Sequence, residues 1–81
     1  MAFAIEIIKI KEENDWVYYH YRSAKKDVDF GQIKISRLNG DVFLIENAEF
    51  DQSGAQATRA GWKLIEHWKR NEYPEKTYWE S

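Results

Sequence analysis

The sequence contains no cysteine and only one proline, and its four glycines are scattered along 81 residues. The absence of cysteine excludes disulfides, thiol chemistry and zinc sites with cysteine ligands. Nothing resembles an interdomain linker, a repeat or a low-complexity segment. No apolar run approaches the roughly 20 residues of a membrane-spanning helix, so we expect no membrane partner. The chain therefore predicts one domain over residues 1–74 and a short C-terminal tail over residues 75–81.

A strong charge of either sign is also lacking. Twelve Lys and Arg oppose fourteen Asp and Glu, for a net charge of −2, and neither half of the chain is basic. This balance disfavours nucleic acid as a partner, because phosphate attraction supplies most of that affinity. The apolar N-terminus is interrupted by Glu6 and Lys9, which is typical of a strand rather than a secretory signal. We therefore expect a cytoplasmic protein.

Aromatic residues are abundant: four Trp, five Tyr and four Phe. Together with β-branched residues they fill four segments separated by polar turns, which predicts four strands. We place these strands at Ala2–Ile10, Asp15–Ser23, Val28–Ser36 and Asp41–Glu46. Asn-Gly between apolar runs is a strong hairpin signal, and here it joins the last two strands. The expected fold class is α+β: a four-stranded antiparallel meander followed by one C-terminal helix (ββββα).

Hairpin turns fix which side chains share a sheet face. A two-residue loop at Asn39-Gly40 pairs Ile35 with Leu44 and Ser36 with Phe43. One face of the resulting hairpin carries Ile33, Ile35, Val42 and Leu44. The other face carries Lys34, Ser36, Phe43 and Ile45. A loop at Glu13-Asn14 pairs Ile10 with Val17 and Ile8 with Tyr19 on one face, and Lys9 with Tyr18 and Lys11 with Trp16 on the other. A β-bulge would change this second register. Both faces of the predicted sheet therefore carry apolar groups.

One helical pattern follows the strands, from Ala55 to about Asn71. Ser53 with Gln56 fits a capping box, Asp51 is an alternative cap, and Pro74 marks the end. An apolar stripe recurs at helical spacing and comprises Ala57, Ala60, Gly61, Leu64, Ile65 and Trp68. Gly61 is unfavourable inside a helix, so its presence predicts a close approach between helix and sheet.

One helix covers only one face of such a sheet, so the second face needs another cover. Either the tail packs on the sheet, or a second copy of the chain covers it with the tail at the interface. We expect a homodimer or another protein partner, because Tyr and Trp are favoured at interfaces. An exposed edge strand pairing across a two-fold axis would serve equally well. The candidate interaction surface comprises Trp16, Tyr18, His20, Phe43, Ile45, Tyr78 and Trp79.

Catalytic chemistry finds little support in the sequence. His20 and His67 are the only histidines and match no metal-binding spacing, since a metal site needs three or four convergent ligands. The carboxylates cluster in turns, where solvation leaves them unsuited to acid–base catalysis. No phosphate-binding loop or nucleophile elbow occurs. We expect a non-enzymatic protein with no metal or cofactor.

One alternative function uses the same sheet face. Aromatic rings interleaved with cations stack bases and track phosphates in single-stranded nucleic-acid binders. The residues that could do so here are Lys9, Lys11, Trp16, Tyr18 and Lys34. The net charge and the lack of an RNA-recognition consensus argue against this alternative, so the protein-interaction hypothesis stays ahead.

Overall fold

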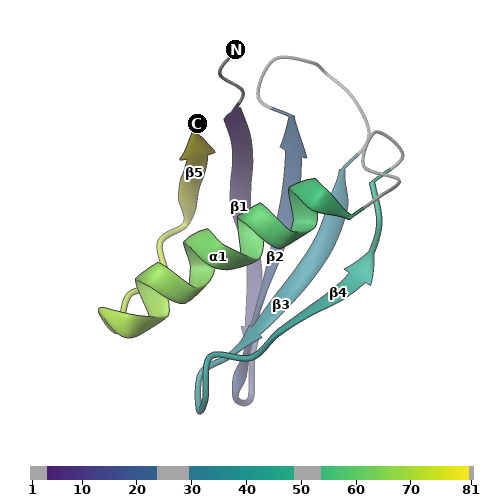
Figure 1. Cartoon of the computed structure of the whole chain (residues 1–81). Coiled ribbons are helices and arrows are strands. Elements are labelled where there is room, and N and C mark those ends of the chain that lie inside the picture. The colour runs from purple at the N-terminus through teal and green to yellow at the C-terminus, as the bar shows by residue number, and fades with distance from the viewer. Residues whose placement is uncertain (1–3, 24–29, 49–53, 81) are drawn as a thin grey trace.

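The computed structural model describes residues 4–23, 30–48 and 54–80. Its five strands form one antiparallel sheet in the order β4-β3-β2-β1-β5, and α1 crosses one face of that sheet (Figure 1). The element bounds, in chain order, are β1 Ala4–Glu13, β2 Trp16–Ser23, β3 Gly31–Ser36, β4 Val42–Glu46, α1 Ala55–Lys69 and β5 Lys76–Glu80. The α+β class and the antiparallel sheet are confirmed. The expected strand starts at Ala2 and Val28 lie outside the described residues.

The prediction of four strands is wrong, because the C-terminal tail forms a fifth. Strand β5 runs antiparallel to β1, with Trp79 opposite Ile5 and Thr77 opposite Ile7. The tail thus extends the sheet at its edge rather than lying across the second face. Its alternation of Thr, Tyr and Trp suits a strand. Its pairing partner lies at the other end of the chain, however, so no local turn signals the pairing.

The hydrophobic core lies between α1 and the sheet face that it covers. Alternate residues of β1, β2 and β3 supply its strand side, as period-two patterning requires. The largest fully buried side chains are Tyr19, Tyr21, Ile5, Ile7, Ile33, Ile35, Leu64 and Val17. Both tyrosine hydroxyls have partners: that of Tyr19 donates to the Pro74 carbonyl at 3.0 Å, and that of Tyr21 accepts from the Ala48 amide at 3.3 Å. Buried tyrosines need such partners. The indole Nε1 of Trp79, which packs against this core, is by contrast buried with no hydrogen-bond partner among the described residues.

Helix α1 buries the predicted stripe, with Ala57, Ala60, Gly61 and Leu64 buried. A Cβ on Gly61 would lie 3.1 Å from Cγ1 of Val42, which confirms the close approach between helix and sheet. The proposed caps Ser53 and Asp51 lie outside the described residues.

The helix ends earlier than the sequence predicts, before it reaches Pro74. Asn71 adopts a left-handed conformation (φ 58°), and the amide of Glu72 donates to the carbonyl of His67 at 2.9 Å. This reversal is a common helix C-terminus. It therefore ends α1 at Lys69.

The β3–β4 turn differs from the predicted two-residue loop. Ile35 pairs with Val42 and Lys34 with Phe43, so the register shifts by two residues. Hydrogen bonds to Ser36 explain the longer turn: the Gly40 amide donates to its carbonyl at 3.0 Å, and the Leu38 amide donates to its Oγ at 3.2 Å. Because the shift is even up to the Ile33–Leu44 pair, the faces predicted for Val42, Phe43 and Leu44 survive. A further register shift between Gln32 and Ile33 leaves Ile45 as the extra residue of a β-bulge.

The β1–β2 hairpin turns at Asn14-Asp15 rather than Glu13-Asn14. Asn14 has a φ of 57°, and Glu13 pairs with Trp16. A register shift then falls between Lys9 and Lys11, so that Lys9 pairs with Tyr19 instead of Tyr18. This bulge turns Lys9 toward the helix side of the sheet, contrary to the sequence prediction.

Candidate interaction surface

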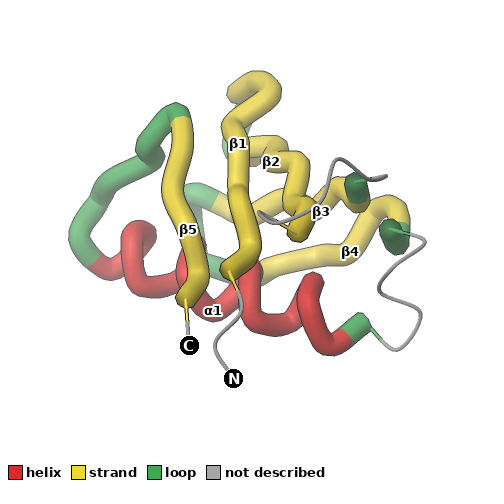
Figure 2. Tube along the Cα trace, turned by 90° about the horizontal axis from the view of Figure 1, so that it is seen from above, coloured by secondary structure: helices red, strands yellow, loops and turns green. Residues whose placement is uncertain are grey.

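The face of the sheet opposite α1 carries a row of alternating cations and rings. Figure 2 shows α1 on one side of the strands. On the other side, the register places Lys11 opposite Tyr18, Tyr18 opposite Lys34, and Lys34 opposite Phe43. We call this surface the outer face. Four residues predicted for the two alternative sites therefore lie in one row across β1, β2, β3 and β4.

Lys34 lies at the centre of an aromatic cluster on the outer face. Its Nζ is 4.2 Å from the Trp16 ring centroid, 5.9 Å from that of Tyr18 and 6.0 Å from that of Phe43. The rings of Trp16 and Phe43 meet edge to face at 5.5 Å. Each cation–π contact at such a partly exposed position stabilises by about 0.5–1 kcal/mol. The cluster is therefore an ordered platform, with its cation already held by its rings.

The β5 side of the outer face is ionic. Glu6 accepts from Nε of Arg22 at 2.7 Å and from the hydroxyl of Tyr78 at 3.3 Å, and it forms an ion pair with Lys76 at 3.2 Å. The hydrogen bond from Arg22, and then the contacts with Lys76, hold the pKa of the Glu6 carboxyl below its ordinary value against the opposing effect of burial. Tyr78 is thus separated from the aromatic cluster by a charged region.

Besides Tyr78, three predicted site residues lie away from the cluster. Trp79 faces α1, where it packs against the core with its ring 5.8 Å from that of Trp62. The ammonium of Lys9 donates to Glu12 at 2.9 Å and to the Tyr73 carbonyl at 3.0 Å, on the helix side. His20 lies on the outer face beyond the row and stacks against Phe30, with ring centroids 4.0 Å apart. Lys9 and Trp79 therefore do not contribute to an outer-face site.

Strand β4 exposes apolar side chains at consecutive positions. Phe43, Leu44 and Ile45 are 50%, 47% and 46% exposed, and β4 forms one edge of the sheet. Edge strands usually carry charges that discourage further pairing. The opposite edge, β5, begins with the charged Lys76. Among the described residues, the run from Val42 to Ile45 is therefore an uncharged edge segment, flanked by Asp41 and Glu46 and ended by a β-bulge after Leu44.

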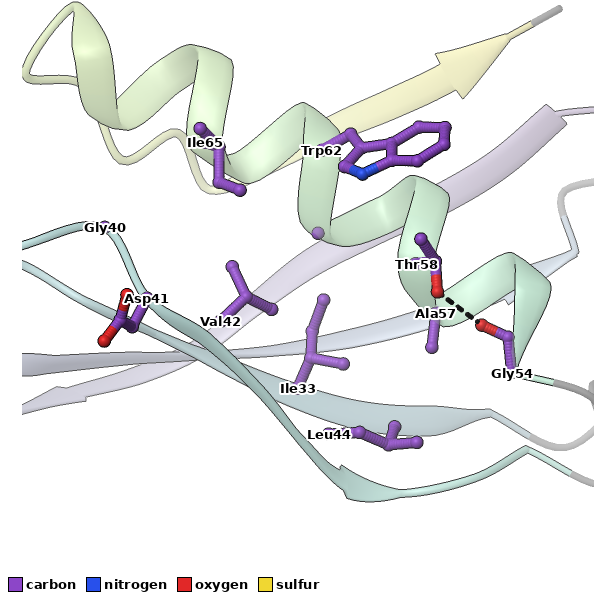
Figure 3. A pocket seen from close by; sticks show the side chains of 11 residues that line it. Ile33, Gly40, Asp41, Val42, Leu44, Gly54, Ala57, Thr58, Trp62 and Ile65 are labelled. Carbon is purple, nitrogen blue, oxygen red and sulfur yellow. Dashed lines mark hydrogen bonds between the residues drawn. The ribbon is translucent and has the colours of Figure 1, made fainter.

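A pocket of about 530 Å³ opens between α1 and β4 (Figure 3). Its described lining is mainly apolar, with Asp41 as its acidic group: Ile33, Gly40, Asp41, Val42, Leu44, Gly54, Ala57, Thr58, Gly61, Trp62 and Ile65. The predicted site did not include this pocket, since its existence depends on where α1 lies over the sheet. The available sequence signal was four successive apolar residues, Val42 to Ile45, too many for a strand with one covered face.

The two histidines lie apart and have different surroundings. Burial lowers the pKa of His20, against the opposing effect of Glu46. His67 bridges α1 to β5: its Nε2 is 3.0 Å from Oγ1 of Thr77, and its Nδ1 is 3.4 Å from Oε1 of Glu72. The hydroxyl–imidazole–carboxylate order resembles a nucleophile–base pair with its orienting acid. The described pocket lining includes none of the three, so we interpret them as a clasp that holds β5 against the helix.

Within residues 4–23, 30–48 and 54–80, no three His, Cys, Asp or Glu side chains converge as a metal site would require. The described helix is neither long nor apolar enough to cross a bilayer. No protein-family model matches the chain, and no match was found among curated proteins or solved structures.

Proposed function

We propose that this chain is a non-catalytic interaction domain that associates with a second copy of itself. The observation that carries the proposal is the run of half-exposed apolar side chains along the edge strand β4, beside the aromatic cluster of Trp16, Tyr18 and Lys34. Clustered aromatic anchors dominate the energetics of protein interfaces. Relative to the sequence hypothesis, the proposed surface moves toward β4 and away from Tyr78 and Trp79.

Sedimentation equilibrium tests self-association directly. We expect the average mass to rise from 9.7 kDa toward twice that value as the concentration increases from micromolar to millimolar. Leu44→Lys should weaken the association at least about tenfold, because a charge must then be buried. Leu38→Lys is the matched control, since Leu38 is an aliphatic side chain 73% exposed in the β3–β4 turn. A mass that stays at 9.7 kDa throughout would remove the proposal.

Single-strand nucleic-acid binding is a second candidate, supported by the same row of rings and cations. Lys34 lies over Trp16, and Nζ of Lys11 is 4.7 Å from the Tyr18 centroid. Bases could stack there only if these ammonium groups moved aside, and the net charge of −2 opposes phosphate. Titrating tryptophan fluorescence with mixed oligonucleotides at low salt separates the candidates. Salt-sensitive quenching that is lost in a Lys11→Gln, Lys34→Gln double variant would favour nucleic acid, and no quenching would eliminate it.

A further inference from the structure

The main chain of β4 leaves hydrogen-bonding groups facing away from the sheet. The Ser36 amide donates to the Asp41 carbonyl at 2.8 Å, so Asp41 turns its carbonyl toward β3. Bonded and non-bonded positions alternate along an antiparallel ladder. Val42 and Leu44 therefore direct their amide and carbonyl groups toward the open edge, whereas Phe43 directs its own toward β3.

The same two residues line the pocket between α1 and β4. Val42 and Leu44 form part of its floor (Figure 3). Phe43 lies on the outer face, where its ring meets that of Trp16. In a strand added to this edge, side chains opposite Val42 and Leu44 would face the pocket, and the one between them would face the outer side. The incoming strand must therefore be apolar on both faces.

We propose that this strand is β4 of a second copy, paired antiparallel about a two-fold axis at Phe43. The proposal rests on self-association and specifies its geometry. Phe43 lies opposite Phe43 of the second copy, and Val42 lies opposite its Leu44. Each Val42–Leu44 pair exchanges two main-chain hydrogen bonds, so all the outward groups of both residues are satisfied. The two sheets become one continuous sheet.

Self-complementarity is the reason for choosing a second copy over another peptide. Strand β4 is itself an apolar stretch of Val, Phe, Leu and Ile, as both faces of the edge demand. In this register the Asp41 residues of the two copies lie at opposite ends of the paired segment, and the bulge at Ile45 ends the regular ladder there. Both α1 helices lie on the same face, and Val42 and Leu44 of each copy extend the apolar floor of the other copy's pocket.

Engineered cysteines test the register, because the natural chain has none. Opposed non-hydrogen-bonded residues have Cα atoms about 4.5 Å apart, within the range that a disulfide spans. Phe43→Cys should therefore form a covalent dimer under mild oxidation at least about tenfold faster than Ile45→Cys, whose two cysteines would lie more than about 10 Å apart. Tyr78→Cys, an aromatic replaced on the opposite edge, is the second control.

A second crosslinking test leaves Phe43 in place, in case its replacement weakens the fold. Val42→Cys mixed with Leu44→Cys should crosslink faster than either variant alone, because only the mixture brings cysteines opposite one another. If the unaltered chain dimerises but neither test gives this preference, the β4 pairing is wrong while self-association stands. Assemblies that grow beyond a dimer would also overturn it, because they indicate an open-ended contact such as β4 with β5. If the unaltered chain stays monomeric at every concentration, both proposals fail.

Discussion

The ammonium of Lys34 lies 4.2 Å from the centroid of the Trp16 ring, on the sheet face that α1 leaves open. Trp16 is in β2 and Lys34 is in β3, so this contact joins two neighbouring strands from outside the core. It orders the outer face, which no element of the described residues covers.

This contact predicts a measurable coupling between the two side chains. A double-mutant cycle with Lys34→Met and Trp16→Leu should give a coupling free energy of about 0.5–1 kcal/mol, read from urea unfolding at neutral pH. Substitution of Lys34 by Met keeps the aliphatic stem, so only the charge is lost. The equivalent cycle of Lys34 with Tyr78, on the far edge, should show no coupling. Strict additivity at Lys34 and Trp16 would refute the interpretation.

Glu6 predicts a pH-dependent contribution to stability. Its folded pKa lies below the ordinary value of 4.5, chiefly because Arg22 donates to its carboxylate. A depressed pKa stabilises the fold above the unfolded value and loses that contribution as the pH falls through the folded pKa. Glu6→Gln should lower the free energy of unfolding at neutral pH, because the charged partner of Arg22 is lost. The loss should be only about 1 kcal/mol, because Arg22 is partly exposed to solvent.

The control for this prediction is the unaltered chain measured over the same pH range. The difference between the two proteins should shrink as the pH is lowered from 5 toward and below the folded pKa of Glu6. Thermal or urea unfolding monitored by tryptophan fluorescence is sufficient. A difference that stays constant with pH would show that the carboxylate charge does not contribute.

Two glycines with positive φ should differ in their tolerance of alanine. Gly40 has a φ of 78° and Gly54 a φ of 80°, but an added Cβ at Gly40 would lie 2.7 Å from the Trp68 ring, whereas one at Gly54 meets nothing within 4 Å. Gly54→Ala should cost about 1–2 kcal/mol of stability from backbone conformation alone. Gly40→Ala should cost at least about 1 kcal/mol more, since the ring must move. Equal costs in urea unfolding would contradict this assignment.

The contact between His67 and Thr77 predicts that β5 depends on the helix. Thr77→Val keeps the shape of the side chain but removes the hydroxyl, and should destabilise the fold by about 1 kcal/mol. Combined with His67→Ala, the losses should be less than additive, since both variants remove the same hydrogen bond. Faster amide exchange should be confined to β5 and the turn before it. Uniform acceleration over the whole sheet would argue against a local clasp.

The sequence predicts which strands form the hairpins and which face of β3 and β4 the helix covers, because these features depend on local alternation. Both turns and both registers differ from the prediction. Ile33, Ile35, Val42 and Leu44 share the helix side as expected, even though the turn is longer than Asn39-Gly40 implies. The hydrogen bonds to Ser36 that lengthen it are specific to the folded turn. An even shift of register leaves the faces unchanged, so the error does not reach the core.

The remaining features depend on contacts that are distant in sequence. Strand β5 pairs with β1 across almost the whole chain, so nothing near Lys76 reveals it. The bulge before Lys11 turned Lys9 away from the predicted cation row, and alternation alone cannot locate a bulge. The pocket beside β4 likewise depends on the path of α1 over the sheet. The apolar stripe of the helix shows which side faces the sheet, but not over which strands the helix lies.

Amide hydrogen exchange on the unaltered chain tests the central claim most directly. We predict that the Val42 and Leu44 amides, which face the open edge of β4, exchange at least about tenfold more slowly at millimolar than at micromolar concentration. Outward-facing amides of β5 should show no such change. Exchange at Val42 and Leu44 that is fast and independent of concentration would contradict the claim that β4 is where two copies of this chain meet.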